Sequence, residues 1–577
     1  MRNMLPRFLL LLLLLGLLAG PAPSWAQVGA TSDWAWATQL GPSAGSNRTG
    51  FVNGVAADAA GNVTIGGEFD PDLRFAGSPL VLGTNRPPDP RTGFTYTNGF
   101  LAQYRADGQL NWTLNLESQG GRVVDVAADA AGNLYALGYC NRGLVIGGAL
   151  VVATPGPRAF LLKVSAAGIV QWASDVVEAG YGVSDGQGNW KLAVDAAGNS
   201  VVFGTYRGSL TVGTQTYTSP VAYTKQPFLV RVNAAGQVAG SWAGQQPKGD
   251  DDARFYNGLA LSPTGDVYLA GWVFDATLLF GNLPPVAGPT NTPRSTGFLV
   301  KISSANIPEW VLVGTLATPT AGNYFDDVKV SAAGHVYALG GMSTNPLTLG
   351  TQTVPNPNND NAFVLRLTPE GTIRRSATGT LSPRGLALGP HEDLYIVTLV
   401  NAVRWGAVQL TAPAGAQQQV SVLRLDSTGR ALQGWLASGP AIARQPRLAV
   451  DGLGQATVAS WLYGTGTFTF GTRSATAPDL WGMFVARTSA PVLAVRAAQA
   501  VPGLALYPNP ARQTVTVGLA RAAPAQVQLF DMLGRLVRTQ ALPGPGPLDL
   551  RALPAGVYQV RVQQGPTQSY RHLTVMP

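Results

Sequence analysis

The chain has 577 residues, of which 46% are hydrophobic and only 12% carry a charge. This composition excludes an intrinsically disordered protein, which combines low hydrophobicity with high net charge. The net charge of +8 is spread over the whole chain without a long basic run, so it does not indicate a nucleic-acid-binding protein. The 70 glycines and 42 prolines indicate many tight turns between short strands.

The first 26 residues have the three parts of a secretory signal. Arg2 and Arg7 make a basic start, a leucine-rich stretch follows, and a small-residue region ends at Ala26. The leucine-rich stretch is shorter than the roughly 20 residues that span a bilayer, so a membrane anchor is the weaker alternative. We expect cleavage between Ala26 and Gln27, and the later sequence has no stretch long and apolar enough to span a membrane.

One sequence unit recurs seven times after the predicted signal. Its clearest element is an apolar strand, a turn that ends in glycine and a polar residue, and a second apolar strand, as in VAADAAGNLYALG (Val126–Gly138). The residue after the turn glycine, or its equivalent, is Asn62, Asn133, Asn199, Asp266, His335, Asp393 and Gln455. These positions lie between 58 and 71 residues apart, a regularity that indicates a repeat architecture.

Three further patterns keep step with this hairpin. An aliphatic-x-hydrophobic-Gly run follows it, as in LTVG (Leu210–Gly213), and then a strand with a basic residue near its end, as in FLLKV (Phe160–Val164). A tryptophan opens every unit except the sixth: Trp36, Trp112, Trp172, Trp242, Trp310 and Trp435. Each unit therefore supplies about four short strands, which cannot bury both faces of their own sheet.

Four-stranded antiparallel units of this length, stacked face to face, predict an all-β, seven-bladed β-propeller over residues 31–487. A linear β-solenoid is the alternative, but its repeats are much shorter than these units. In each hairpin turn the aspartate is expected to bind the backbone ahead of it, and the glycine to adopt a positive φ.

The hairpin D-A-A-G-N-x-Y-hydrophobic-x-G, followed by F-L-x-[KR], resembles the bacterial β-propeller repeat called SBBP. The resemblance is tight in units two to five and loose in unit six, where Glu392 replaces the turn glycine. It implies a propeller and an extracellular setting. It implies no catalytic residues, because the family has no common activity.

The repeat ends at Arg487, and a linker of small residues (488–503) leads to a different tail (504–577). Polar and apolar residues alternate in Thr514–Val517 and Val557–Val562, a pattern typical of half-buried strands. Several short strands in a segment of this size predict a small immunoglobulin-like β-sandwich.

The tail resembles the type A C-terminal sorting domain of the type IX secretion system. Three motifs carry the resemblance in this order: YPNP, then LFD with LGR, then LPAGVY. The sorting motif positions are Tyr507, Pro508, Asn509, Pro510, Gly534, Arg535, Gly556 and Tyr558. The resemblance implies that the type IX machinery is a partner. It also implies passage through the periplasm, followed by release or attachment at the outer-membrane surface; a generic terminal immunoglobulin-like domain is the alternative.

The sequence contains no motif for catalysis, for a cofactor or for a metal. Cys140 is the single cysteine, the histidines form no zinc pattern, and no phosphate loop or nucleophile elbow occurs. We therefore predict no catalytic, cofactor-binding or metal-binding residues, and we expect His335 and His391 to be exposed turn residues. Three carboxylates follow Gly249 and could hold a cation, although a solvated charge run is the simpler interpretation.

These observations favour an exported, non-enzymatic propeller that binds a glycan or a protein at the cell surface. Long loops at 85–98, 284–296 and 355–361 are rich in Pro, Asn and Thr and are candidate ligand contacts. The alternative is an extracellular polysaccharide hydrolase or lyase, which requires paired carboxylates facing one cleft.

Overall fold

The chain forms two compact units, Met1–Pro491 and Val492–Pro577. The computed structural model describes residues 33–42, 50–84, 96–118, 120–141, 143–153, 158–179, 190–221, 224–249, 256–290, 294–315, 321–343, 346–416, 419–477, 481–490, 501, 503–531, 535–564 and 567–577. These residues contain strands, one short 3-10 turn (Pro390–Glu392) and no α-helix, so the all-β prediction is confirmed. Accordingly, no helix in these ranges could cross a membrane. The predicted signal and its cleavage site at Ala26 and Gln27 lie outside the described residues.

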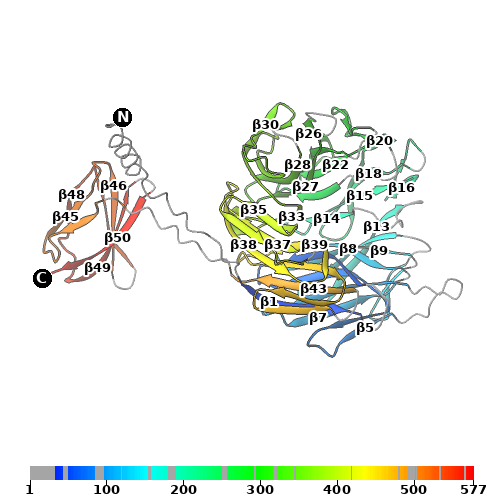
Figure 1. Ribbon diagram of the computed structural model, residues 1–577, viewed down its shortest axis with the longest axis horizontal. Helices are drawn as coiled ribbons and strands as arrows, with labels where there is room; N and C mark the ends of the chain where they lie inside the picture. The colour runs from blue at the N-terminus through cyan, green and yellow to red at the C-terminus, as the bar shows by residue number, and fades with distance from the viewer. Residues whose placement is uncertain are drawn as a thin grey trace, which may run out of the picture. The chain divides into compact units, whose positions relative to one another are not determined.

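The first unit contains seven antiparallel sheets with four main strands each (Figure 1). The first strands are β2 (Gly50–Ala57), β8 (Arg122–Ala128), β14 (Lys191–Val194), β21 (Tyr256–Leu261), β27 (Asn323–Val330), β33 (Pro383–Leu388) and β39 (Ile442–Val450). The second strands are β3 (Val63–Phe69), β9 (Leu134–Cys140), β15 (Ser200–Tyr206), β22 (Val267–Val273), β28 (Val336–Met342), β34 (Leu394–Leu399) and β40 (Ala456–Tyr463). The third strands are β6 (Asn98–Tyr104), β12 (Arg158–Val164), β18 (Gln226–Val232), β25 (Thr296–Ile302), β31 (Ala362–Leu367), β37 (Val420–Leu425) and β43 (Trp481–Thr488). The fourth strands are β7 (Leu110–Leu116), β13 (Val170–Ala179), β19 (Val238–Ala243), β26 (Pro308–Thr315), β32 (Ile373–Gly379), β38 (Ala431–Ser438) and β1 (Trp34–Gly41).

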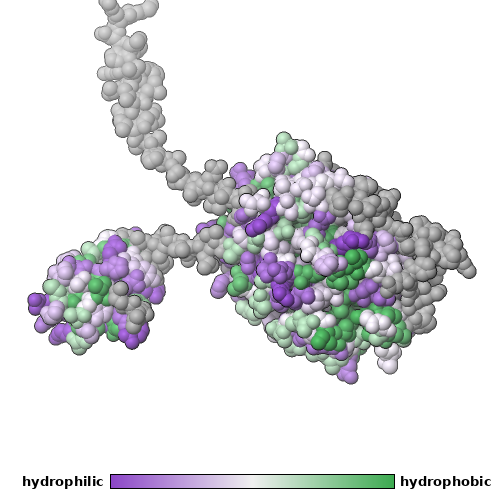
Figure 2. Space-filling view, turned by 90° about the horizontal axis from the view of Figure 1, so that it is seen from below, coloured by the Kyte–Doolittle hydropathy of each residue, from purple (hydrophilic) through white to green (hydrophobic). Residues whose placement is uncertain are grey.

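The apolar cores lie between successive sheets. Each first strand contacts the first strand of the next sheet, and β39 of the seventh sheet contacts β2 of the first. Seven clusters of buried apolar side chains are each shared by two neighbouring sheets. This arrangement explains why strands such as β9 are apolar at almost every position, since both faces pack against a neighbour. On the side shown in Figure 2, hydrophobic and hydrophilic residues are intermingled.

The seventh sheet is completed by the N-terminal strand. β1 pairs antiparallel with β43, with Leu40 opposite Met483 and Trp36 opposite Arg487. The Trp34 indole is 1% exposed within the core shared by the sixth and seventh sheets. Segments from the two ends of the first unit are therefore joined by a strand ladder.

Among the described residues each repeat contributes six strands, compared with the predicted four or so, and β20 (Gln245–Gly249) is an additional strand. The aliphatic-x-hydrophobic-Gly run is the first strand of a short extra hairpin between the second and third main strands. The hairpins are β4 (Asp72–Phe75) with β5 (Val81–Gly83), β10 (Leu144–Ile146) with β11 (Ala149–Val152), β16 (Ser209–Val212) with β17 (Gln215–Thr218), β23 (Ala276–Leu279) with β24 (Val286–Ala287), β29 (Leu347–Leu349) with β30 (Gln352–Val354), β35 (Ala402–Trp405) with β36 (Val408–Thr411), and β41 (Gly466–Phe470) with β42 (Arg473–Ala477).

These inserted hairpins connect each sheet to the preceding one. β16 pairs with β13, β29 with β26, β41 with β38, and β4 with β1. β23 pairs with β20 (Gln245–Gly249), which follows β19 after one residue. Single bridges connect the remaining two hairpins, at Glu117 with Val145 and at Thr380 with Arg404. The hairpin therefore covers the exposed edge of the neighbouring fourth strand.

The repeat turns have the predicted geometry. In the second sheet, the Asp129 carboxylate accepts hydrogen bonds from the amides of Ala131 and Asn133, and Gly132 has a φ of +79°. In the sixth sheet, Glu392 itself adopts a positive φ of 61° where the other turns use glycine. The left-handed backbone conformation of this turn is thus kept without glycine, and Glu392 bears a conformational strain that glycine would avoid.

The recurring tryptophans pack against the next sheet. The Trp112 indole donates to the Ala166 carbonyl at 3.1 Å, and a Cβ on Gly168 would lie 2.8 Å from its ring. Trp36 and Trp172 pack in the same way against later turns. Gly168, in the turn between β12 and β13, is needed because the indole ring occupies the space that a side chain would fill.

The second unit is a two-layer β structure with its own core. One sheet has the order β44 (Ala505–Tyr507), β45 (Thr514–Gly518), β48 (Gly546–Asp549). The other has the order β47 (Leu536–Leu542), β46 (Ala525–Phe530), β49 (Gly556–Gln564), β50 (Thr567–Val575). Side chains from both sheets meet in one buried cluster, and β45 and β49 alternate between buried and more exposed residues as predicted.

Candidate functional site

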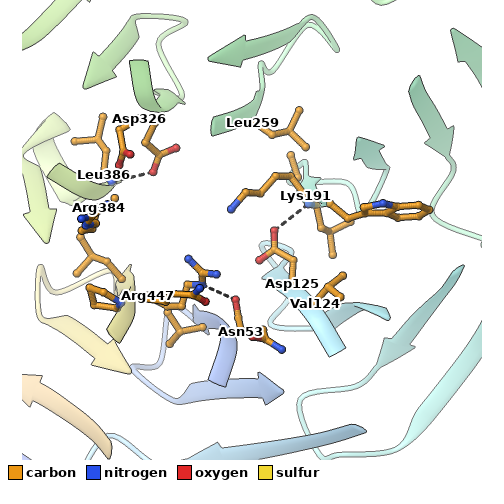
Figure 3. A pocket seen from close by; sticks show the side chains of 18 of the residues that line it. Asn53, Val124, Asp125, Lys191, Leu259, Asp326, Arg384, Leu386 and Arg447 are labelled. Carbon is orange, nitrogen blue, oxygen red and sulfur yellow. Dashed lines mark hydrogen bonds between the residues drawn. The ribbon is translucent and has the colours of Figure 1, made fainter. Parts of the chain in front are cut away.

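A cavity of about 1270 Å³ lies where the first strands of the seven sheets meet (Figure 3). Its wall includes the beginnings of first strands and the ends of second strands, such as Trp272 in β22 and Trp461 in β40. The connections from one sheet to the next lie at these strand ends, whereas the repeat turns lie at the opposite ends.

One position of the repeat supplies several charged groups to this wall. We call it the cavity position: the residue immediately before the first aliphatic residue of each repeat. It is occupied by Gly54, Asp125, Lys191, Gly258, Asp327, Gly385 and Arg447. All four charged residues of this set line the cavity. A Cβ on Gly54 or on Gly258 would lie 2.6 Å from the backbone of the next first strand, so no side chain fits there.

β-bulges direct additional side chains into the cavity. The ladders of β2, β8, β27 and β33 each skip the residue before the cavity position. A bulge turns such an unpaired residue out of the regular alternation. The skipped residues Asn53, Val124, Asp326 and Arg384 all line the cavity (Figure 3).

Two of the carboxylates connect neighbouring sheets. Asp125 in β8 accepts the amide hydrogen of Leu192 in β14 at 3.0 Å. Asp327 in β27 accepts the amide hydrogen of Leu386 in β33 at 2.8 Å. Each also accepts the amide of the residue that follows it in the chain. Both carboxylates are therefore engaged in holding the first strands together.

Arg447 forms a similar connection between the seventh sheet and the first. Its Nε donates to the Asn53 carbonyl at 2.6 Å, and the Asn53 side-chain amide donates to the Val123 carbonyl at 2.9 Å. This chain of contacts joins β39, β2 and β8 at one level of the cavity wall.

Burial in the cavity wall raises the pKa values of three of its acidic side chains. Burial raises the pKa of Asp326 to about 7, and the charge of Asp327 adds to this effect against the attraction of Arg384. Burial raises the pKa of Asp125 and of Glu68 as well, partly opposed by Lys191 and Arg122 respectively. Burial therefore disfavours the charged form of these three carboxyl groups.

The cations of the wall are also shifted. Burial lowers the pKa of Lys191, and Arg447 adds to this effect, while Asp125 and Asp327 oppose it. Burial lowers the pKa of Arg447 against the attraction of the nearby carboxylates. Both side chains are half-buried and extend into the cavity in Figure 3.

Aromatic side chains form part of the wall and continue beyond it. Trp272 lies 6.2 Å from Phe274, and Phe51 lies 5.2 Å from Trp461, each measured between ring centroids. All four line the cavity. Trp461 stacks on Trp481 at 5.4 Å, and Tyr463, which is 42% exposed, contacts Trp481 at 5.2 Å.

The residues that line this cavity were not predicted from the sequence. A usable signal was present, because aligning the repeats on their turns places Asp125, Lys191, Asp327 and Arg447 at one position of otherwise apolar strands. The alignment alone does not say that this end of the strands borders a cavity.

The candidate loops contribute little to the cavity among the described residues. Arg294 and Ser295 of the 284–296 loop line it. In the 355–361 loop, Asn356 and Asp360 are buried and hydrogen-bonded to each other, so this loop is held internally. Residues 85–95 lie outside the described residues, as do Asp250, Asp251 and Asp252 of the predicted charge run.

The two turn histidines differ in environment. His391 is exposed as expected, whereas His335 is half-buried, with Nδ1 2.8 Å from Glu392. Although burial opposes it, hydrogen bonds from Tyr337, Ser331 and His335 lower the pKa of Glu392 to about 2. His335 therefore belongs to a hydrogen-bond network between the turns of the fifth and sixth sheets, which sequence position alone did not indicate.

The described residues contain no group of three or more His, Cys, Asp or Glu side chains placed to hold a metal ion. Cys140 is a buried free thiol in the core between the first and second sheets.

The described sorting motif residues lie in strands and turns of the second unit. The Asn509 side chain donates to the His572 carbonyl at 2.7 Å and accepts the Thr574 amide at 2.9 Å, which fixes the YPNP segment against β50. The Tyr558 hydroxyl donates to the Pro554 carbonyl at 2.7 Å. Arg535 pairs with Asp531 at 2.7 Å and remains largely exposed.

The other motif positions are also placed, with one exception. Tyr507 is 55% exposed at the end of β44, Pro508 and Pro510 flank Asn509, and Gly556 begins β49. Gly534 lies outside the described residues.

A family model for a secretion system C-terminal sorting domain matches residues 505–576. The protein is secreted or held at the cell surface. The sorting domain also implies an interaction with the type IX secretion machinery. No curated protein matches the chain.

Several solved structures are similar to this chain at low identity. A Dyadobacter fermentans protein of unknown function has 9% identity, covers 79% of this chain and 99% of its own, and has a TM-score of 0.32. The rhamnogalacturonan lyase PL11 of Bacillus licheniformis has 13% identity, coverage of 69% and 72%, and a TM-score of 0.28. A mutant of the GH43 protein BlXynB from Bacillus licheniformis has 9% identity, coverage of 79% and 97%, and a TM-score of 0.22. Because these TM-scores are all below 0.5, the similarities do not establish a shared function.

Proposed function

We propose that the first unit is a seven-bladed β-propeller closed by the pairing of β1 with β43. The contacts from sheet to sheet and back to the first, together with the seven shared cores, support this proposal. The SBBP-type resemblance of the repeats agrees with it.

The same proposal assigns a secretory signal to residues 1–26, the propeller to 31–487, a linker to 488–503 and the sorting domain to 504–577. The division of the chain after Pro491 and the family match at 505–576 support the last two assignments. Cleavage between Ala26 and Gln27 and recognition of the sorting motif residues belong to this proposal.

The propeller acts as an extracellular binding module whose ligand occupies the cavity. The cavity itself carries this proposal, because a concave space of about 1270 Å³ lined by aromatic and charged side chains is typical of a ligand site. Of the two ligand classes expected from the sequence, a glycan suits this wall better than a protein. Sugars combine apolar faces, which pack on aromatic rings, with many hydroxyl groups that need hydrogen-bond partners.

The experiment compares the full secreted chain with Val124→Trp, which places a large ring in the cavity. We expect the wild type to bind at least one polysaccharide on a glycan array and Val124→Trp to lose that binding. Val238→Trp is the matched control, because Val238 lies exposed at the start of β19 and outside the cavity wall. A wild type that binds proteins but no glycan contradicts the ligand class, and equal binding by both variants contradicts the site.

A polysaccharide hydrolase or lyase is the second candidate, and Asp326 is the observation that favours it. A carboxyl group with a pKa of about 7 can act as a general acid near neutral pH. Release of new chain ends from a bound polymer by the wild type, and its loss in Asp326→Asn, would establish this candidate against the binding-only proposal.

A further inference from the structure

The Lys191 ammonium offers a positive charge to the cavity. Within the described residues it makes no hydrogen bond or ion pair at contact distance, and Figure 3 shows it extending into the cavity. Asp125, the carboxylate with the strongest attraction for it, is held by the amides of Val126 and Leu192. A half-buried cation without a direct partner has lost part of its hydration and gains from an anionic ligand.

The wall as a whole carries more positive than negative side chains. Its cations are Arg122, Lys191, Lys225, Arg294, Lys329, Arg384 and Arg447, and its carboxylates are Glu68, Asp125, Asp326 and Asp327. Lys329 pairs with Asp327 at 2.7 Å, so these two charges offset each other. The other six cations of the wall still outnumber its other three carboxylates. A cavity with low-dielectric walls concentrates such a field and attracts anions.

A strip of aromatic rings leads away from this charged wall. The aromatic strip consists of Phe51, Trp461, Trp481 and Tyr463. The centroids of its neighbouring rings lie 5.2 to 5.8 Å apart, and Phe51 contacts both Trp461 and Trp481. Phe51 and Trp461 belong to the cavity wall, while Trp481 and Tyr463 continue along the ends of β43 and β40. Linked sugars can pack on such a strip while one of them reaches the cavity.

We propose that the protein binds an acidic glycan, with a carboxylate or sulfate group in the cavity beside Lys191 and Arg447 and neighbouring sugars on the aromatic strip. This inference rests on the proposed glycan-binding function and names the ligand class. The charged group supplies the anion that the wall attracts, and the rings supply contacts that do not depend on charge.

The test measures binding of the full chain to polygalacturonate, to dextran sulfate and to neutral dextran by calorimetry at low and high salt. We expect one or both acidic polymers to bind and neutral dextran to bind at least about tenfold more weakly. Lys191→Met removes the charge at similar length and should weaken acidic-polymer binding about tenfold or more. Trp481→Ala should weaken it as well, and the acidic polymer that binds identifies the charged group.

Arg430→Met is the matched control, because Arg430 is largely exposed on a turn at the opposite strand ends and pairs there with Asp426. It removes one positive charge and should leave binding unchanged. If Lys191→Met does not fold, as judged by its melting curve, Arg384→Gln on the exposed part of the wall replaces it.

Two outcomes would overturn the inference, and they differ in meaning. Equal binding of neutral and acidic polymers, lost in Trp481→Ala, contradicts the anionic ligand and leaves the glycan-binding function intact. Absence of binding to every polymer here and on the glycan array contradicts the proposed function itself.

Discussion

Individual side chains of the first strands serve two purposes. Asp125, Asp327 and Arg447 hydrogen-bond to the backbone of an adjacent first strand and so hold the sheets together. The neighbouring Asp326 is turned into the cavity by a bulge, and its burial there disfavours the charged form of its carboxyl group. In β27, Asp327, which stabilises the wall, therefore lies next to Asp326, whose charged form is unfavourable.

Asp326 should make the stability of the protein depend on pH. Its pKa is about 7 in the folded chain against an ordinary value of 3.8, so the folded chain binds more protons between these values. The free energy of unfolding should therefore fall as the pH rises from about 4 to about 7. Asp326→Asn should remove this decrease, as urea unfolding at several pH values would show.

Asp107→Asn serves as the control for this measurement, because Asp107 is exposed on a turn outside the cavity wall. A pH profile that is the same in the wild type and in Asp326→Asn would contradict the assigned environment of Asp326.

At the scale of elements, the inserted hairpins are the feature that distinguishes these repeats from simple four-stranded meanders. Each one belongs to one repeat in sequence and to the edge of the preceding sheet in space. Leu210 of β16 shows the consequence, since it lies opposite Ala179 of β13 and is 0% exposed. Apolar residues of the hairpin thus contribute to the main core.

Leu210→Ala should lower the free energy of unfolding by about 2 to 4 kcal/mol, because it leaves a cavity in a packed core. Leu150→Ala in β11 is the matched control: Leu150 also lies in an inserted hairpin but is 61% exposed, so its loss should cost less than about 0.5 kcal/mol. Chemical denaturation of both variants measures the difference. Similar small effects in both would mean that the hairpin does not pack as described.

The elements that could be predicted are those fixed by local chemistry. The repeat turns follow from Asp, Gly and Asn at fixed positions, as at Asp129 and Gly132, and the alternation in Val557–Val562 follows from one buried face. The inserted hairpins were recognised only as single strands, because three or four residues before a glycine do not reveal which distant edge they join. The cavity could not be predicted, because its wall joins residues from all seven sheets that are far apart in the sequence.

At the scale of the whole molecule, the first unit depends on one long-range strand pair. β1 supplies the fourth strand of the seventh sheet and buries Trp34 and Leu40, each 1% exposed. Without it, β43 would have an unpaired edge and two cores would lose side chains. The second unit has a separate core of its own.

Deletion of residues 33–41 should therefore lower the melting temperature of the first unit by several degrees or more. Deletion of 492–577 is the comparison and should leave that transition in place, because the second unit has a core cluster of its own. Differential scanning calorimetry of the two shortened chains separates these effects. An unchanged melting temperature after loss of β1 would contradict its role in completing the seventh sheet.

The pairing of β1 with β43 also sets an order of events during synthesis. The Ser489 hydroxyl donates to the Asp33 carbonyl across 456 positions of the chain. At about 5 to 20 residues per second, a ribosome needs roughly 20 to 90 s to make the intervening segment. The earliest strand of the first unit to be translated thus pairs with the last strand of that unit, and the nascent chain must remain soluble over that interval with its seventh sheet unfinished.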